Sequence, residues 1–156
     1  MENITPFLWF DTNAEEAVNF YTSIFKNSKI GNVSRYGDAG PGPKGSVIVM
    51  NFSLNGQEFM ALNGGPVYKF TEAISFVVNC ENQEEVDHYW DKLSKGGKEI
   101  QCGWLKDKFG LSWQIVPTAL GKLMADKDQQ KANKVMMAML KMTKIIIKDL
   151  EEAYKG

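Results

Sequence analysis

Few side chains in this sequence have the chemistry of a catalytic group. His88 is the only histidine, so one chain cannot supply a metal site built from several histidines. It lies beside Asp87 and close to Glu84 and Asp91 in an expected helix, where it could act as a general base or a metal ligand. A lone histidine among acids is more typical of a solvated helix surface, and we interpret His88 in that way.

Two cysteines and a glycine-rich segment complete the candidates. Cys80 and Cys102 lack the cationic neighbours that favour a reactive thiolate, and Glu81 disfavours one at Cys80, so we expect both thiols to be structural. Gly37–Gly45, rich in glycine and proline, precedes an expected hairpin rather than a helix. This context indicates a lid-like loop and argues against the glycine-rich loop of a methyl-donor-binding fold.

An internal repeat organises the elements that must position these groups. Each copy begins with an apolar run short enough for a buried strand, at residues 7–10 and 76–78. Asn13 and Asn82 follow as expected helix N-caps, each with a glutamate three residues later that can complete a capping box. The sequence therefore predicts a strand followed by a helix in each half.

Short strands follow each expected helix. In the first half, Val47–Leu54 and Glu58–Leu62 are joined by Asn55-Gly56, a strong two-residue hairpin turn. In the second half, Ile100–Trp104 and Leu111–Val116 have the apolar and β-branched composition of strands. Each half is therefore predicted to contain one strand, one helix and two or three further strands.

Residues 119–156 differ from the rest of the chain in charge. Residues 1–118 carry 10 Lys and Arg against 14 Asp and Glu, whereas residues 119–156 carry 8 against 5 and hold five of the eight methionines. We expect helices at Ala119–Lys131 and Asn133–Tyr154. The apolar stripe of the second helix must be covered by the body of the protein or by a partner chain.

Composition excludes several classes of protein. The 156 residues carry 18 Lys and Arg against 19 Asp and Glu, so no broad basic field attracts nucleic acid. No apolar run approaches the ~20 residues of a membrane helix, and no signal-peptide pattern opens the chain. Two cysteines are too few for a secreted disulfide framework. We expect a soluble cytoplasmic protein with neither a nucleic-acid nor a membrane partner.

Several strings in the sequence resemble a known family: ITPFLWFD, AVNFY, EAISFVV, DKFGLSWQIVP and MAMLKMTKIIIKDLEEAY. They are similar to the PhnB-like branch, often labelled demethylubiquinone methyltransferase-like, of the vicinal oxygen chelate superfamily of glyoxalases, bleomycin-resistance proteins and dioxygenases. The resemblance implies an α+β fold in which two βαβββ modules form a glyoxalase-like curled sheet, with a C-terminal helical extension. The expected modules occupy about 1–65 and 71–118 within a body of 1–118, and the extension occupies 119–156.

The resemblance also implies where a metal ion would be held. In metal-dependent relatives, His, Glu or Gln ligands occupy positions that fall here near Ile4, Met60–Leu62, Ala73 or Ile74, and Gln114. Only Gln114 can coordinate a metal, and one amide oxygen does not make a divalent-ion site. We therefore expect no metal site and no cofactor.

A small-molecule pocket remains compatible with an apolar lining and a few polar anchors. Strand alternation from the family positions places the following residues inward or nearby: Gln114, Ser112, Leu8, Phe10, Phe76, Val78, Asn63 and Trp104. Gln114 is the strongest candidate, because a buried amide must find hydrogen-bond partners, whereas the aromatic residues could equally form core.

The sequence thus predicts a metal-free protein that binds or sequesters an unidentified small molecule and forms a homodimer. An alternative is a lyase, isomerase or transferase of the same superfamily that acts on an unknown metabolite, using Gln114 with or without an ion taken from solution. A third possibility is a purely structural protein in which the tail mediates assembly. The residues alone do not decide whether the chain is an enzyme.

Overall fold

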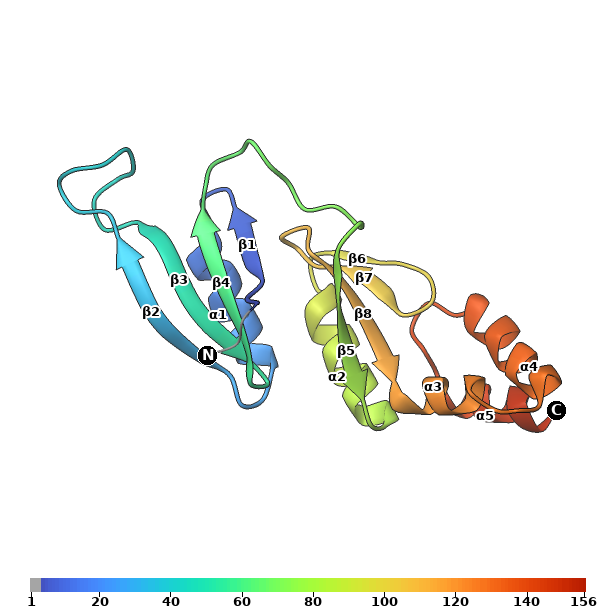
Figure 1. The fold of residues 1–156 in the computed structure, drawn as a ribbon. Coiled ribbons are helices and arrows are strands. Elements are labelled where there is room, and N and C mark those ends of the chain that lie inside the picture. Colours follow the sequence, from blue (N-terminus) through green and yellow to red (C-terminus); the bar gives the residue numbers. More distant parts are fainter. Residues whose placement is uncertain (1–3) are drawn as a thin grey trace. The chain divides into compact units, whose positions relative to one another are not determined.

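The computed structural model describes residues 4–156, so the first three residues of the expected first module lie outside it. The chain divides into two compact units, Met1–Lys69 and Phe70–Gly156. Each unit contains one four-stranded sheet, and its elements follow the order strand, helix and three strands (Figure 1). The α+β fold of two βαβββ modules is therefore confirmed.

The first unit is built from β1 (Phe7–Phe10), α1 (Ala14–Ile24), β2 (Lys29–Arg35), β3 (Val47–Leu54) and β4 (Gln57–Asn63). β1 pairs in parallel with β4, and β3 pairs in antiparallel with both β2 and β4. Asn55 and Gly56 form the expected turn between β3 and β4, with φ values of 49° and 85°. Both residues have the positive φ that a tight two-residue hairpin requires.

Helix α1 covers one face of the first sheet. Tyr21 of α1 stacks on Phe52 of β3 with ring centroids 6.5 Å apart, and Phe52 stacks on Phe59 of β4 at 5.2 Å. Leu8 and Phe10 of β1 lie on the same side of the sheet, because residues paired across strands point to the same face. All five side chains are buried and form the core of this unit.

Helix α1 begins without the cap expected from Asn13. Within residues 4–156, Asn13 makes no side-chain capping hydrogen bond. Asn63 at the end of β4 takes this role: its Oδ1 accepts the N–H of Ala14 at 2.8 Å, and its Nδ2 donates to the carbonyl of Val47 at 3.1 Å. The first turn of α1 is therefore satisfied from the sheet rather than from its own sequence neighbour.

The glycine-rich segment between β2 and β3 folds around Tyr36. The N–H of Tyr36 donates to the carbonyl of Ser46 at 2.9 Å, and its carbonyl accepts from Gly45 at 2.8 Å. A Cβ on Gly42 would lie 2.3 Å from the Tyr36 ring, so a larger residue here would displace that ring. Because the two flanking strands are antiparallel, the segment is a hairpin loop and does not open a helix.

The second unit begins with β5 (Ser75–Cys80), α2 (Gln83–Ser94), β6 (Lys98–Glu99), β7 (Trp104–Lys106) and β8 (Ser112–Pro117). β5 pairs in parallel with β8, as β1 does with β4. The expected strand Ile100–Trp104 is wrong, because strand pairing begins at Trp104. Cys102 and Gly103 have φ values of 60° and 82°, which turn the chain just before β7.

The expected cap of the second helix is confirmed. Asn82 Oδ1 accepts the N–H of Glu85 at 2.9 Å. The Glu85 carboxylate reaches back to the N–H of Glu81 at 2.8 Å, one residue before the amide expected for a capping box. Helix α2 then buries an apolar face formed by Val86, Trp90 and Leu93.

A buried carboxylate fixes the turn between β7 and β8. Asp107 is 2% exposed. Its Oδ1 accepts the N–H groups of Phe109 and Leu111 at 2.8 and 3.0 Å, and its Oδ2 accepts Trp113 Nε1–H at 2.9 Å. Three donors offset the cost of burying the charge and fix the start of β8 relative to β7.

The C-terminal region contains α3 (Thr118–Met124), α4 (Gln129–Leu140) and α5 (Ile147–Lys155). The single helix expected over Asn133–Tyr154 is wrong, because residues 141–146 separate α4 from α5. The region belongs to the second unit and encloses a small core of its own, formed by Leu120, Val135, Ile145 and Leu150.

The break between α4 and α5 has a physical cause. The N–H groups of Cys102 and Gly103 donate to the carbonyls of Met142 and Thr143, both at 2.8 Å. These carbonyls would otherwise be available to a continuing helix. The segment that interrupts the helix is therefore attached to the turn before β7.

The side chain of Gln83 holds the next part of this segment. Its Nε2 donates to the carbonyl of Ile145 at 3.1 Å, and its Oε1 accepts the N–H of Ile147 at 2.8 Å. Lys144 forms an ion pair with Asp87 at 2.9 Å, and Gln83 also donates to that carboxylate. These hydrogen bonds lower the pKa of Asp87. Helix α2 therefore binds the start of α5 through one carboxamide.

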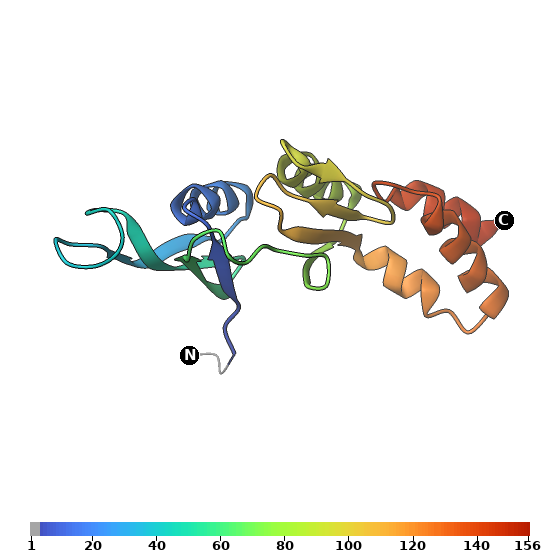
Figure 2. The same cartoon turned by 90° about the horizontal axis from the view of Figure 1, so that it is seen from above.

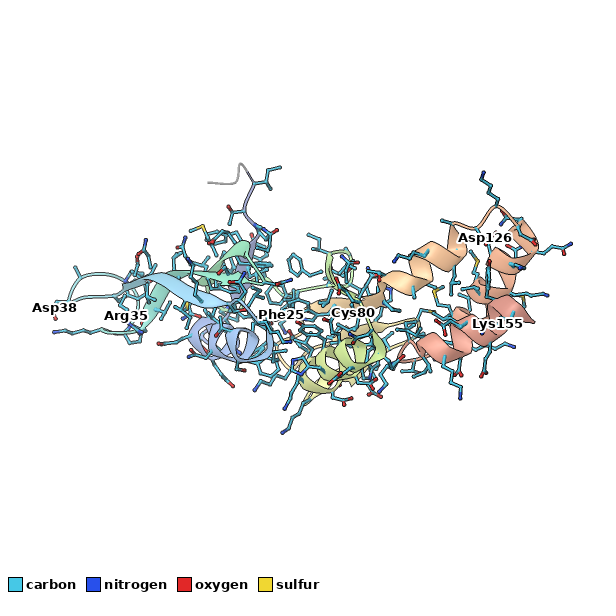
Figure 3. The ribbon with its side chains drawn as sticks, turned by 90° about the horizontal axis from the view of Figure 1, so that it is seen from below. Phe25, Arg35, Asp38, Cys80, Asp126 and Lys155 are labelled. Atoms are coloured by element: carbon cyan, nitrogen blue, oxygen red, sulfur yellow. The ribbon has the colours of Figure 1, made fainter. Side chains whose placement is uncertain are left out.

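A further hydrogen bond joins α5 to the linker between α3 and α4. Tyr154 of α5 donates to Asp126, labelled in Figure 3, at 2.5 Å. This bond lowers the pKa of Asp126 and raises that of Tyr154, because the carboxylate stabilises the protonated phenol. No helix in the described part of the chain has the length and apolar character needed to span a lipid bilayer.

We predict that Asp107→Asn lowers the free energy of unfolding by about 2 kcal/mol. The NH₂ group of the asparagine would face a buried N–H donor whose hydrogen bond the carboxylate accepts in the parent protein. Urea unfolding followed by circular dichroism measures the loss, with exposed Asp91→Asn as the matched control, expected within about 0.5 kcal/mol of the parent. Equal stability of the two variants would show that the Asp107 hydrogen bonds do not support the turn.

We predict that Gln83→Ala loosens the segment 141–147. Loss of the carboxamide leaves the Ile145 carbonyl and the Ile147 N–H without their partner. Hydrogen exchange measured by mass spectrometry should show roughly tenfold faster exchange in peptides covering this segment. The control, Gln101→Ala, changes an exposed glutamine of the same unit and should leave these rates unaltered. If protection from exchange is unchanged in Gln83→Ala, contacts other than the Gln83 carboxamide hold segment 141–147 in place.

Candidate functional site

The two faces of the second sheet differ in what covers them. Phe76 and Val78 of β5 pair with Trp113 and Ile115 of β8, and these side chains lie on the side of α2. In Figure 2, α2 lies on one side of this sheet and α1 lies on one side of the first sheet. The opposite face of the second sheet, here called the open face, carries the alternate residues of each strand: Ser75, Val77, Trp104, Lys106, Ser112 and Gln114.

Gln114 lies at the centre of the open face. It pairs with Val77 on β5 and with Trp104 on β7, so the three side chains form a row across three strands. Gln114 Nε2 donates to Ser75 Oγ at 2.9 Å. Within residues 4–156, Gln114 Oε1 accepts no hydrogen bond, which leaves one acceptor of this amide available.

Ser112 lies one position along the same face of β8. It is 0% exposed, and its Oγ has no hydrogen-bond partner within the described residues. Buried hydroxyl groups are normally hydrogen-bonded, and an exception marks a strained site or a place for an additional partner. The orphan hydroxyl lies between Ser75 and Lys106, its register partners on β5 and β7.

An ion pair borders this polar row. Lys106 Nζ contacts the carboxylate of Glu72, just before β5. The hydrogen bond from Lys106, a backbone hydrogen bond and the positive charge of Lys106 lower the pKa of Glu72. The open face therefore combines two hydroxyls, an amide, an indole and an ion pair, with Val77 as an apolar neighbour. This arrangement can hold a small ligand by hydrogen bonds but contains no evident nucleophile and base pair.

The structure brings together three of the expected site residues. Gln114, Ser112 and Trp104 share the open face of the second sheet. Phe76 and Val78 lie on the opposite face, on the side of α2, together with Trp113. The ring centroids of Phe76 and Trp113 are 5.7 Å apart. The reason is steric: a sheet with one helix buries its largest apolar side chains against that helix.

The expected site residues of the first unit lie in the core or beside it. Leu8 and Phe10 are 6% and 3% exposed and lie in the core beneath α1, and Asn63 caps that helix. The alternate residues of β1, Phe7 and Trp9, point to the other face, and Phe7 is 49% exposed. On β1 the residues expected at the site are therefore the buried set, whereas on β5 Phe76 and Val78 are half-buried.

Three residues of the open face escaped the sequence analysis: Ser75, Val77 and Lys106. In the string SFVVNC, both alternating sets contain an apolar residue, so periodicity alone does not assign the faces. The face follows from the structure: Gln114 pairs with a residue on its own face, and the parallel β5–β8 register makes that residue Val77.

The remaining reactive side chains do not form a catalytic group. His88 is exposed, and its ring packs edge-on against Tyr89 at 4.9 Å. Burial, reinforced by the negative charge of Glu85, raises the pKa of the Cys80 thiol to about 12. A thiol with this pKa is neutral and unreactive at physiological pH. Cys102 occupies the turn before β7.

The donor set does not fit a resident metal ion. The positions that the resemblance assigns to ligands hold Ile4, Met60–Leu62, Ala73–Ile74 and Gln114, and the amide of Gln114 is the one donor side chain among them. The residues described by the structure contain no group of three or more His, Cys, Asp or Glu able to hold an ion. Divalent cations require several converging oxygen, nitrogen or sulfur ligands.

Comparison with known proteins identifies the family. A family model described as 3-demethylubiquinone-9 3-methyltransferase matches residues 2–116, so the C-terminal region with α3, α4 and α5 lies outside it. A PhnB protein from Bacillus cereus, also described as a 3-demethylubiquinone-9 3-methyltransferase, is 44% identical and superposes with a TM-score of 0.70. The match covers 74% of this chain and 99% of the relative.

Two more distant structures share the fold. A protein from Pseudomonas aeruginosa is 19% identical over 75% of this chain and 98% of its own, with a TM-score of 0.64. The fosfomycin resistance protein FosX from Listeria monocytogenes, solved with Mn(II) and sulfate, is 14% identical over 75% of this chain and 90% of its own, with a TM-score of 0.51. No curated protein matches this sequence.

The matched description names a family and does not establish a reaction, because one fold hosts many activities. The family model covers more than half of the chain, and the Bacillus cereus relative is matched over almost its whole length. The chain therefore belongs to the 3-demethylubiquinone-9 3-methyltransferase family, together with the PhnB protein of Bacillus cereus.

Proposed function

We propose that this protein binds or sequesters a small molecule on the open face of the second sheet, with Gln114 as the polar anchor and without a resident metal. The observation that carries the proposal is the row of Val77, Gln114 and Trp104 beside the orphan hydroxyl of Ser112. Small-molecule sites combine apolar surface with a few fixed polar groups, and this row has that composition.

The hydrogen bond from Gln114 Nε2 to Ser75 Oγ supports this role. It holds the carboxamide in one orientation before any ligand arrives, so little side-chain entropy is lost on binding. The amide is partly buried, which strengthens a hydrogen bond to a ligand relative to one made in bulk water. Gln114 Oε1 is the atom offered to the ligand.

The donor chemistry favours binding over the lyase, isomerase or transferase alternative. Catalysis in metal-dependent relatives requires ligands that can coordinate and polarise a substrate oxygen. The neutral amide of Gln114 neither titrates near physiological pH nor supplies a nucleophile. The open face can therefore select and hold a molecule by its hydrogen-bonding pattern and shape.

We predict that Gln114→Leu removes the binding of compounds that stabilise the parent protein. A library of small metabolites and aromatic compounds, screened by thermal shift in the presence of EDTA, supplies the probes. A ligand at 100 times its dissociation constant should stabilise the fold by about 2.7 kcal/mol, and Gln114→Leu should abolish most of that effect. Gln101→Leu, an exposed glutamine of the same unit, is the matched control.

Three outcomes of this screen would contradict the proposal. The first is that no compound stabilises the parent protein. The second is that every stabilising compound acts equally on Gln114→Leu. The third is that binding requires added Zn, Ni, Mn or Fe, or that one equivalent of such a metal survives dialysis against EDTA in elemental analysis. That third result would support the metal-dependent alternative.

We propose in addition that the protein forms a homodimer through α4. Met136, Met137 and Leu140 are 41%, 62% and 57% exposed and lie on one side of this helix. A cluster of exposed methionines and leucine is typical of an adaptable contact surface. Gln129 and Asn133 continue this side toward the start of α4, and the exposed Lys134 and Lys141 flank it at Met137.

We predict that replacing Met136, Met137 and Leu140 together by Gln converts the dimer into a monomer. Light scattering coupled to size-exclusion chromatography should give twice 17.5 kDa for the parent protein and 17.5 kDa for the variant. Glu151→Gln with Glu152→Gln alters an exposed part of α5 and serves as the control. A monomeric parent protein, or a variant that stays dimeric, would show that α4 does not form a dimer interface.

A further inference from the structure

One line of four side chains crosses the whole open face of the second sheet. Lys98 of β6 pairs with Lys106 of β7. Lys106 pairs in turn with Ser112 of β8, which pairs with Ser75 of β5. Residues paired across strands point to the same face, and the sheet order β5–β8–β7–β6 therefore places two ammonium groups next to two hydroxyls (Figure 1). We call these four residues the lysine–serine row. Each of them can donate a hydrogen bond to an anion.

The pairing of Lys98 with Lys106 has an electrostatic cost, because like charges directly opposite each other destabilise a sheet. Glu99, the one acidic residue of β6 and β7, pairs on the other face and accepts the indole N–H of Trp90. The carboxylate that reaches the row comes instead from Glu72, which contacts Lys106 Nζ. The hydrogen bond from Lys106 lowers the pKa of Glu72, and the charge of Lys98 acts in the same direction.

Glu72 is a replaceable occupant of the row. Its side chain is 54% exposed, and that of Lys106 is 33% exposed. Ion pairs with this much exposure contribute little to stability. Glu72 also lies between β4 and β5, where residues 64–74 form no helix or strand. A carboxylate from another molecule can therefore take its place without breaking the pairing of the sheet.

A buried hydroxyl beside the ion pair lacks a partner. Ser112 is 0% exposed, and its Oγ makes no hydrogen bond to any described residue. Buried hydroxyls are normally hydrogen-bonded, so this one marks a place for an additional partner. A ligand reaches Ser112 only after the side chains around it have moved. Release of Lys106, its direct neighbour in the row, from Glu72 is the movement that the ion pair allows.

We propose that the lysine–serine row binds the carboxylate group of a small ligand, and that Glu72 occupies the row until such a ligand replaces it. One ligand oxygen accepts from Lys106 Nζ, the other accepts from the Ser112 hydroxyl, and Lys98 contributes its charge. The rest of the ligand extends along β8 to Gln114, two residues or about 7 Å away. This inference rests on the proposed function and adds the class of ligand and a second anchor.

Acetate is the first probe, because it offers a carboxylate and almost nothing else. Chloride is replaced by acetate at constant pH and ionic strength, and the backbone amides of Lys106 and Ser112 are followed by NMR. These signals should shift saturably. The apparent dissociation constant should be at least about tenfold lower in Glu72→Gln than in the parent protein, because the carboxylate of Glu72 competes for the row. Glu151→Gln removes the same charge from the exposed side of α5 and should behave as the parent does.

Two results of this titration would overturn the proposal. The first is the same dissociation constant in the parent protein and in Glu72→Gln. The second is the absence of a saturable shift in Glu72→Gln. Either result would show that Glu72 and Lys106 form an ordinary surface ion pair that holds no place for a ligand.

A second pair of probes tests the class of ligand in the parent protein. Phenylacetate and phenylacetamide have the same shape, but the amide carries no charge. Isothermal titration should show phenylacetate binding at least about tenfold tighter, since hydrogen bonds between charged groups are the stronger ones. Equal affinity, or no binding of phenylacetate, would overturn the carboxylate assignment. Because this comparison uses the parent protein, it holds even if a variant folds poorly.

Two further substitutions, made in the Glu72→Gln background, assign the contacts. Lys106→Met keeps the apolar stem but removes the ammonium group, and it should abolish saturable acetate binding. Ser112→Ala should weaken acetate binding about tenfold, the effect of one hydrogen bond. Lys122→Met changes an exposed lysine of α3 and should leave the affinity unaltered. Unchanged affinity in Lys106→Met would overturn the proposal, and unchanged affinity in Ser112→Ala would overturn the role of that hydroxyl.

These outcomes separate the inference from the proposed function. If library compounds depend on Gln114 but acetate does not bind Glu72→Gln, the proposed function stands and the carboxylate subsite is rejected. If acetate binds as expected but no library compound loses binding in Gln114→Leu, the subsite stands and Gln114 is rejected as the anchor.

Discussion

The position of Gln114 depends on the register of β8 between its two neighbouring strands. Because side chains alternate along a strand, a slip of one residue would exchange the two faces of β8 and bury Gln114 against α2. Asp107 prevents such a slip at the start of the strand by binding two backbone N–H groups and the indole of Trp113. The helix side is then filled by Trp113 and Ile115, which are 2% and 0% exposed. The amide consequently lies on the open face, where it meets Val77 and Trp104.

The C-terminal region stabilises the same part of the molecule from another direction. Its segment 141–147 binds the turn before β7 through backbone hydrogen bonds and binds α2 through Gln83. The turn positions Trp104, so the tail contributes to the open face without supplying a residue to it. The family model ends at residue 116, and this support is therefore an addition to the matched fold.

Local signals in the sequence predicted local features well. The repeat, the Asn55-Gly56 turn and the Asn82 cap each depend on neighbouring residues, and the structure confirms them. Features that depend on distant partners were missed. Asn13 is a reasonable cap by type, but Asn63 reaches the first turn of α1 across the sheet, and no spacing rule includes a residue 49 positions away. The break in the expected tail helix likewise depends on donors at Cys102 and Gly103.

The candidate site shows the same division. Gln114 was identifiable because an amide in an apolar strand needs partners, whereas the faces of β1 and β5 were not, since both alternating sets in those strands contain apolar residues. A crystal structure of the protein with a bound small molecule would test the central claim most directly. The account predicts density on the open face of the second sheet, with a ligand atom within hydrogen-bond distance of Gln114 Oε1. A ligand held elsewhere, with the Gln114 amide left in water, would contradict it.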